Sequence, residues 1–140
     1  MIEIIIADTG VIVAFLDSRE RWHSWAQQQW RQLPAPFITC ESVITEACFL
    51  MRDLPNGEQD VLALVETGLL IIDFSLSDEV GAIKILMQKY ENVPMSLADA
   101  CLVRMSEQTE NSKIFTLDSD FWIYRKNGKS PIPLIIPKGN

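Results

Sequence analysis

The chain has 140 residues, of which 48% are hydrophobic, and its formal net charge at pH 7 is −7. This length suits one hydrophobic core, so we expect residues 1–140 to form a single domain. The negative charge argues against a protein that binds nucleic acid through its whole surface, because such proteins are usually basic. No apolar run approaches the roughly 20 residues that span a membrane, and the first residues lack the basic region of a signal peptide. We therefore expect a soluble, cytoplasmic protein.

The cysteines and the single histidine form no pattern typical of a metal or redox site. Cys40, Cys48 and Cys101 contain no Cys-x-x-Cys pair and lie among apolar neighbours, which predicts buried free thiols. His23 alone cannot supply a multi-histidine zinc site, and its tryptophan neighbours indicate a surface or packing residue.

The first predicted strand ends on a carboxylate. The apolar run from Ile4 to Ala7 is followed by Asp8, and an apolar helical block begins at Val11. A short apolar run of this kind is typical of a strand buried on both faces. Asp8 would then stand at the carboxyl end of a central strand, where open α/β sheets hold their sites. Thr9 can cap the helix, although Asp8 itself can also be interpreted as only a helix cap.

The next helices carry a tryptophan stripe and then a second acid. Residues 18–32 are predicted to form a helix whose tryptophans recur at helical spacing, which is typical of a core or a subunit interface. A short strand at residues 37–39 precedes a helix at residues 41–53. Glu46 falls on the apolar stripe of that helix, where a carboxylate is costly unless something compensates it. The alternative is a partly exposed glutamate at the edge of the stripe.

The second half of the chain repeats the alternation of helices and strands. The expected helices cover residues 58–67, 78–90 and 96–108, and the expected strands cover residues 69–74, 113–117 and 134–136. Gly68 is expected to stop the first of these helices, and a capping-box-like Ser96-Leu97-Ala98-Asp99 starts the last. A helical turn follows Asp118, and residues 130–133 are expected to be an extended connector. The pattern predicts a three-layer α/β/α fold with a central parallel sheet of four to five strands.

Four acids far apart in the chain are expected to converge. Asp8 and Asp118 each follow an apolar strand, and the ends of neighbouring strands lie about 5 Å apart. Glu46 lies on a helix that must pack on the sheet, and Asp99 lies in the first turn of another helix, which can also be explained as a favourable charge at a helix start. Like charges raise each other's pKa in such a cluster, and a divalent cation resolves the conflict. Oxygen ligands suit Mg²⁺ or Mn²⁺.

The last twenty residues carry positive charge only. No acid follows Asp120, while four basic residues do, at Arg125, Lys126, Lys129 and Lys138. This segment is either a solvated end of the chain or a basic lip beside the acidic site.

Four short motifs contain these acids and resemble the PIN-domain family, in particular the VapC-like toxin ribonucleases of type II toxin–antitoxin modules. The motifs are Ile6-Ala7-Asp8-Thr9, Ile44-Thr45-Glu46-Ala47, Ser96-Leu97-Ala98-Asp99-Ala100 and Thr116-Leu117-Asp118-Ser119-Asp120-Phe121. Their order and spacing carry the resemblance, which extends from Ile4 to Phe121.

The resemblance implies a Mg²⁺- or Mn²⁺-dependent endoribonuclease that hydrolyses RNA phosphodiesters with a metal-activated water. It implies that the metal is held by Asp8, Glu46, Asp99 and Asp118. Thr9 and Thr116 would orient ligands or water, with Thr116 in the catalytic set beside the four acids, and Asp120 would be an auxiliary metal-binding acid. It also implies a homodimer, an RNA substrate and a cognate antitoxin protein that covers the site.

Two other classes of function remain as alternatives. The first is a non-catalytic PIN-like module that binds proteins through the tryptophan-rich helix. The second is phosphoryl transfer through an aspartyl phosphate at Asp8. Enzymes of that kind usually need a second aspartate two residues later, where this chain has Gly10, and a lysine after a late strand, where it has none.

Overall fold

The computed structural model describes residues 2–140, which are built around a five-stranded sheet. In spatial order, the strands are β3 (Leu70–Ile72), β2 (Phe37–Thr39), β1 (Ile4–Ala7), β4 (Ser112–Phe115) and β7 (Leu134–Ile135). Every neighbouring pair is parallel. β1 is central, and Ile5, Ile6 and Ala7 have no exposed surface. The predicted parallel sheet and the buried first strand are therefore confirmed.

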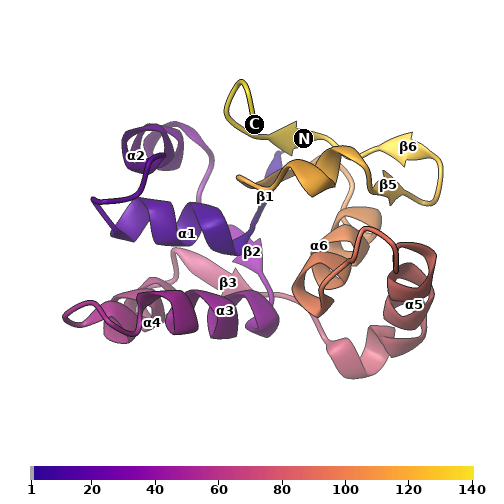
Figure 1. Cartoon of the computed structure of the whole chain (residues 1–140), viewed down its shortest axis with the longest axis horizontal. Coiled ribbons are helices and arrows are strands. Elements are labelled where there is room, and N and C mark those ends of the chain that lie inside the picture. Colours follow the sequence, from indigo (N-terminus) through magenta and orange to yellow (C-terminus); the bar gives the residue numbers. More distant parts are fainter. Residues whose placement is uncertain (1) are drawn as a thin grey trace.

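Helices cover both faces of this sheet. They are α1 (Thr9–Leu16), α2 (His23–Gln32), α3 (Glu41–Met51), α4 (Gly57–Glu66), α5 (Leu76–Lys89) and α6 (Leu97–Gln108). From β1 through β2 to β3 the chain steps one way across the sheet, and from β3 to β4 it steps back. Right-handed crossovers then place α1–α4 on one face and α5 and α6 on the other, as Figure 1 shows. This is the expected three-layer fold.

β1 and β4 are direct neighbours, as the sequence interpretation required for its two strand-end aspartates. Ala7 pairs with Phe115, and the amide of Asp8 donates to the carbonyl of Phe115 at 3.0 Å. The residues that follow the two strands therefore leave the sheet side by side. Because parallel strands end at the same edge, Asp8 and Thr116 are brought together there.

Two tryptophans of α2, Trp25 and Trp30, are partly buried and pack against the core. Trp30 stacks on Phe15 with ring centroids 4.2 Å apart, and it also meets Phe37 at 4.7 Å. Trp25 meets Phe115 of β4 at 5.6 Å. Of the two interpretations of the stripe, the core position is the one observed for these two rings.

Several predicted element ends were wrong, for local reasons. α2 begins at His23 instead of residue 18, because the Asp17 carboxylate accepts hydrogen bonds from the amide and guanidinium of Arg19 and holds a turn. α5 begins at Leu76 instead of residue 77 or 78, because Ser75 caps it by accepting from the amide of Asp78. Two strands are also shorter than predicted, since β3 ends at residue 72 and β4 at residue 115.

The extended connector expected near residues 130–133 is instead half of a hairpin. β5 (Arg125–Lys126) pairs antiparallel with β6 (Ser130–Pro131). Asn127 and Gly128 connect them with φ values of 53° and 71°. Such a turn needs residues that tolerate positive φ, and Asn-Gly is the preferred pair. β7 follows and pairs with β4, which confirms the predicted last edge strand.

The sulfur and imidazole side chains have packing roles. All three cysteines are free, and Cys40 and Cys101 are buried as predicted, whereas Cys48 is only half-buried. The Nδ1 atom of His23 lies 2.7 Å from the carbonyl oxygen of Ala14, which ties the start of α2 to α1.

Within residues 2–140, none of the helices combines the length and the apolar character needed to cross a bilayer.

Candidate functional site

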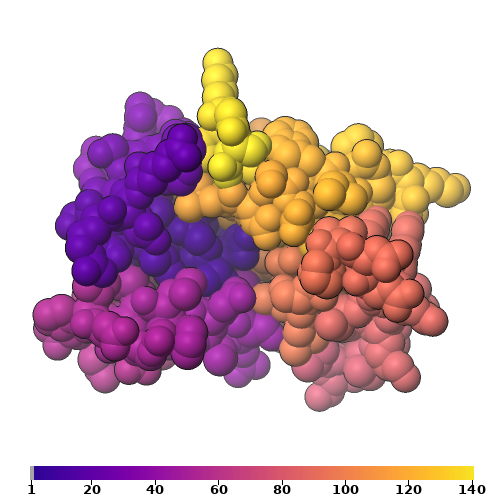
Figure 2. Space-filling view, in the orientation of Figure 1, coloured from indigo at the N-terminus to yellow at the C-terminus, as the bar shows by residue number. Residues whose placement is uncertain are grey.

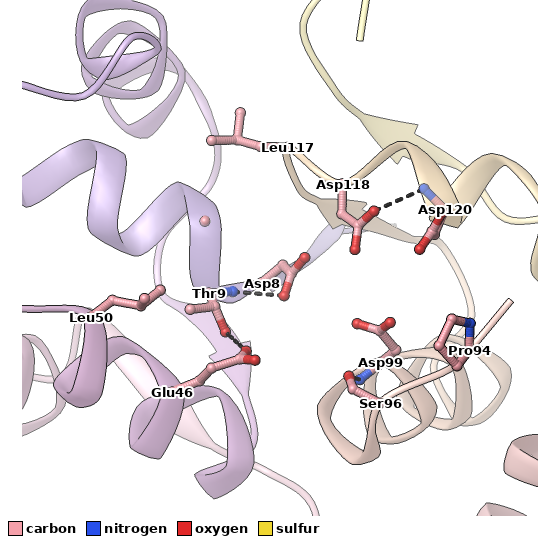
Figure 3. A pocket seen from close by; sticks show the side chains of 11 residues that line it. Asp8, Thr9, Glu46, Leu50, Pro94, Ser96, Asp99, Leu117, Asp118 and Asp120 are labelled. Carbon is pink, nitrogen blue, oxygen red and sulfur yellow. Dashed lines mark hydrogen bonds between the residues drawn. The ribbon is translucent and has the colours of Figure 1, made fainter.

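A pocket of about 440 Å³ opens where β1 and β4 end. The surface is hollowed there, where the indigo, magenta and orange segments meet (Figure 2). The lining residues are Asp8, Thr9, Gly10, Glu46, Leu50, Pro94, Ser96, Asp99, Leu117, Asp118 and Asp120 (Figure 3). Five of them are acids, and in the described part of the chain no lysine, arginine or histidine joins them at the lining. The pocket therefore has a strongly negative wall.

Asp8 lies at the back of this pocket with only 6% of its surface exposed. One carboxylate oxygen accepts from the Thr9 amide and the other from the Thr116 hydroxyl, both at 2.7 Å. The pKa of Asp8 is raised to about 7. Burial is the main cause and the charges of Asp99 and Asp118 add to it, while the two hydrogen bonds act in the opposite direction. Asp8 is also the N-cap of α1, so the expectation that Thr9 caps this helix was wrong.

Thr116 connects the ends of the two central strands. Its hydroxyl donates to Asp8 and accepts from the amide of Asp118 at 2.9 Å, and it is fully buried. The hydroxyl thus fixes the carboxylate of one strand end and the backbone of the other.

Replacing Thr116 with valine should raise the pKa of Asp8 above about 7, because the hydroxyl hydrogen bond that lowers it is lost. The free energy of unfolding should fall by about 1–3 kcal/mol, since the Asp118 amide loses its partner. Titration of the Asp8 carboxyl by NMR and urea denaturation would measure both effects. Thr116→Ser keeps the hydroxyl and is the control. An unchanged Asp8 titration in the valine variant would contradict the assignment.

Glu46 reaches the pocket from α3. Its Oε1 atom accepts from the Thr9 hydroxyl at 2.5 Å. The prediction that Glu46 lies on a buried stripe was wrong, since its side chain is exposed. The buried positions of α3 are Val43, Ala47 and Met51, at a spacing of four, and Leu50 is 54% exposed at the pocket wall. The alternative of an exposed edge position describes Glu46 correctly.

Asp99 enters the pocket from the first turn of α6. Ser96 caps that helix as predicted, accepting from the Asp99 amide at 3.0 Å. The carboxylate accepts from the hydroxyl of Tyr124 at 2.9 Å. Burial raises the pKa of Asp99, the Tyr124 hydrogen bond lowers it, and the charge of Asp118 raises it. Sequence reasoning missed Tyr124, and no periodicity or motif marks it.

Asp118 and Asp120 lie together on the opposite wall. Asp118 caps the 3-10 helix η1 (Ser119–Trp122) by accepting from the Asp120 amide at 2.9 Å. This is the helical turn predicted after the fourth strand. In Figure 3 the carboxylates of Asp118 and Asp99 point toward one another across the opening. Burial and the charge of Asp118 raise the pKa of Asp120.

The donor set is of the kind that hard cations prefer. Carboxylate oxygens suit Mg²⁺ and Mn²⁺ better than softer metals, and a wall of five acids is relieved by added positive charge. Across residues 2–140, however, no three such side chains are already arranged to hold an ion as they stand. The chemistry of the residues fits a divalent cation. To coordinate one together, the acid side chains would have to change rotamer.

The sequence model of the family described as PIN domain matches residues 5–127. The chain belongs to the PIN domain family. All five pocket acids lie within the matched range. The match ends in the β5–β6 hairpin, so β7 lies beyond it.

Two crystal structures share this PIN fold. The sarcin-ricin loop cleaving toxin VapC20 of Mycobacterium tuberculosis superposes with a TM-score of 0.73 and 18% identity, over 83% of this chain and 91% of that one. VapBC2 of Rickettsia felis, bound to a DNA fragment from its promoter, superposes with a TM-score of 0.61 and 16% identity, over 96% and 99%. No curated protein sequence matches significantly. At these identities the structures establish a shared fold.

The basic residues of the C-terminal segment stand outside the acidic pocket of this PIN domain. None of Arg125, Lys126, Lys129 and Lys138 contributes to its lining. The Arg125 guanidinium donates to the carbonyl oxygens of Trp122 and Tyr124, so it stabilises the start of the hairpin. Any basic lip therefore flanks the pocket and does not neutralise it.

Proposed function

We propose that this PIN domain, formed by residues 1–140, is a Mg²⁺- or Mn²⁺-dependent endoribonuclease that hydrolyses RNA phosphodiesters with an activated water. The observation that carries the proposal is the convergence of five carboxylates, from distant parts of the chain, on one pocket whose lining holds no basic residue among those described. A phosphodiester is itself negative, so it can bind beside these carboxylates only if a cation binds before it or together with it.

The proposal assigns the pocket side chains as follows. Asp8, Glu46, Asp99 and Asp118 would hold the cation, with Asp120 as an auxiliary acid. A bound Mg²⁺ or Mn²⁺ lowers the pKa of a water and neutralises charge on the scissile phosphate. Thr116 orients Asp8, and Thr9 orients Glu46, through the hydrogen bonds described above. Both hydroxyls would limit rotation of the carboxylates that they hold.

Asp8→Asn and Asp99→Asn should each reduce RNA cleavage by roughly 1000-fold, because ligand loss removes several kcal/mol of transition-state stabilisation. Cleavage of total RNA would be followed with Mn²⁺ and with a chelator. Asp53→Asn, at an exposed acid outside the pocket, is the matched control and should cleave normally. Equal activity of all four proteins, or activity that survives chelation, would refute the proposal.

We further propose that the protein is the toxin of a toxin–antitoxin pair, acting as a homodimer with an antitoxin that covers the pocket. The structural likeness to VapC20 and VapBC2 supports this. A second groove, of about 480 Å³, shares Glu46 and Ser96 with the pocket and is lined by Phe49 and Leu97. Phe49 is 59% exposed and Leu97 is 40% exposed, and a protein partner would bury such apolar surface.

The partner proposal predicts that light scattering gives about twice the 15.9 kDa mass of one chain. It also predicts that the product of a small neighbouring reading frame inhibits cleavage. Phe49→Ala should weaken that inhibition by about tenfold, the loss expected when a buried aromatic contact is truncated, while leaving cleavage intact. A monomer that the neighbouring gene product neither binds nor inhibits would contradict the proposal.

The non-catalytic alternative would use the tryptophans of α2 as its interface. Trp25 and Trp30 pack on Phe115 and Phe15 and are only partly buried, so part of each ring is already engaged in the core. Calorimetry would separate the two functions, because a binding-only module should show no Mn²⁺ affinity that depends on Asp8 and Asp118.

A further inference from the structure

Tyr124 is a fully buried tyrosine whose hydroxyl reaches a pocket acid. Its ring packs edge-on against Tyr90 and Phe121, with centroids 5.0 Å and 5.2 Å away. The hydroxyl donates to the Oδ2 atom of Asp99 at 2.9 Å. The ring is thus held by two aromatic neighbours, so the position of the hydroxyl is set by the core and not by the pocket.

The same short segment carries Asp118, Asp120 and Tyr124. Asp118 caps η1, and the Tyr124 amide donates to the carbonyl of Asp120 at 3.3 Å. From the end of this turn, the Tyr124 side chain crosses to α6 and its Asp99. One hydrogen bond therefore links the two walls of the pocket, which are 25 residues apart in sequence.

Asp99 needs such a link because its neighbours repel it. Asp118 faces it across the opening (Figure 3), and like charges at short range push carboxylates apart. Ser96 also restrains Asp99, since its hydroxyl accepts from the Asp99 amide, and contacts of Ser96 with the carboxylate lower the pKa of that group. Both contacts come from the start of α6 itself. A fixed donor on the opposite wall would hold the carboxylate in the pocket against that repulsion.

We propose that Tyr124 is a positioning residue, whose hydroxyl keeps the Asp99 carboxylate directed into the pocket beside Asp118 and Asp120, so that these acids can close around a divalent cation. This inference rests on the proposed nuclease function. Hydrogen-bond partners of metal ligands are typically worth about 10- to 100-fold in metal affinity or activity. Tyr124 touches no substrate in this role and acts only through Asp99.

The test is Tyr124→Phe, which keeps the ring and deletes the hydroxyl. We expect Mn²⁺ to bind about tenfold more weakly, by calorimetry and by electron paramagnetic resonance, and kcat to fall about tenfold, with KM for RNA unchanged. Tyr90→Phe is the matched control, because that hydroxyl lies in the same cluster but accepts from the Arg125 amide at 2.9 Å. It should leave Mn²⁺ affinity and kcat at wild-type levels.

Two further variants at position 124 keep the test independent of folding. 4-Aminophenylalanine restores a donor and should rescue Mn²⁺ affinity, whereas 4-fluorophenylalanine fills the space without donating and should not. The fluorinated protein replaces Tyr124→Phe if that variant loses its near-ultraviolet circular dichroism.

A folded, non-donating variant with wild-type Mn²⁺ affinity and kcat would overturn the positioning role, and so would a variant that changes only KM. The Asp99→Asn protein distinguishes this failure from failure of the proposed function. If Asp99→Asn loses Mn²⁺ and the position-124 variants do not, only the role of Tyr124 is wrong. If wild type and Asp99→Asn bind Mn²⁺ equally, both proposals are wrong.

Discussion

Asp8→Asn should reduce RNA cleavage roughly 1000-fold and yet make the metal-free protein more stable at pH 8. Burial raises the pKa of Asp8 from 3.8 to about 7, so the folded state holds this proton more tightly than the unfolded state. The resulting stabilisation is complete below about pH 4 and is lost as the pH rises toward 7. Above pH 7 the folded protein must hold a desolvated carboxylate. Asparagine removes that charge and still offers an oxygen to the Thr9 amide.

Raising the pKa from 3.8 to about 7 corresponds to more than about 4 kcal/mol. Loss of the hydrogen bond that the Thr116 hydroxyl donates to Asp8 offsets part of this, so the expected gain at pH 8 is about 2–4 kcal/mol. Urea denaturation in the presence of a chelator, at pH 8 and pH 5, would measure it. The gain should shrink at pH 5, where Asp8 is largely protonated in the folded state. Asp53→Asn, at an exposed acid, should change stability little at either pH. An Asp8→Asn effect that is the same at both pH values would show that burial of the charge is not its cause.

A gain of stability with a loss of activity is typical of active sites, where groups needed for chemistry are held in unfavourable surroundings. Added Mn²⁺ should narrow the difference at pH 8, because the cation binds only the folded wild-type pocket.

Gly57→Ala should be strongly destabilising, although it adds a single methyl group. A Cβ atom at Gly57 would stand 1.8 Å from the carbonyl oxygen of Met51 and 2.8 Å from its carbon. These are backbone atoms at the end of α3, so the clash cannot be relieved by turning a side chain. We expect a loss of about 3 kcal/mol, at the upper end for overpacked sites, and a fall in Tm of about 10 °C.

Gly81→Ala is the matched control for this substitution. Gly81 lies in α5 and is exposed. An added Cβ would have no heavy atom within 4 Å beyond its chain neighbours and the adjacent backbone of α5. Alanine is the better helix former by about 1 kcal/mol, so this variant should be slightly more stable than wild type. Thermal unfolding of both variants gives the comparison. If the Gly57→Ala protein has the same Tm as wild type, Gly57 does not approach the Met51 carbonyl as closely as described.

The fold was predictable where the chain is strongly periodic. The apolar runs before Asp8 and Asp118 marked the two central strands, and right-handed crossovers leave few arrangements for them. The short hairpin formed by β5 and β6 was missed because two-residue strands show no alternation. The Asn127-Gly128 pair was the available signal, since it is the preferred turn for such a hairpin.

The pocket residues were predictable to different degrees. Asp8 and Asp118 followed from the two apolar strands that precede them, although β4 ends at Phe115 and leaves two residues before Asp118. Glu46 was selected for a buried stripe with Val43, Ala47 and Leu50, and the structure buries Val43, Ala47 and Met51 instead. Positions at the border of the buried face of a helix cannot be assigned from spacing alone. The contact of Tyr124 with Asp99 depends on how η1 packs relative to α6. Local sequence patterns do not predict such a tertiary arrangement.

β7 completes the sheet beside the strand that leads to Thr116, and the Thr116 amide donates to the Ile135 carbonyl at 3.0 Å. Chains emerge from the ribosome N-terminal end first, so β4 emerges before residues 134–135. Until those residues pair with it, β4 lacks its outer neighbour and the Thr116 amide lacks its acceptor. Correct placement of the hydroxyl that holds Asp8 therefore depends on a strand that is made after all five pocket acids.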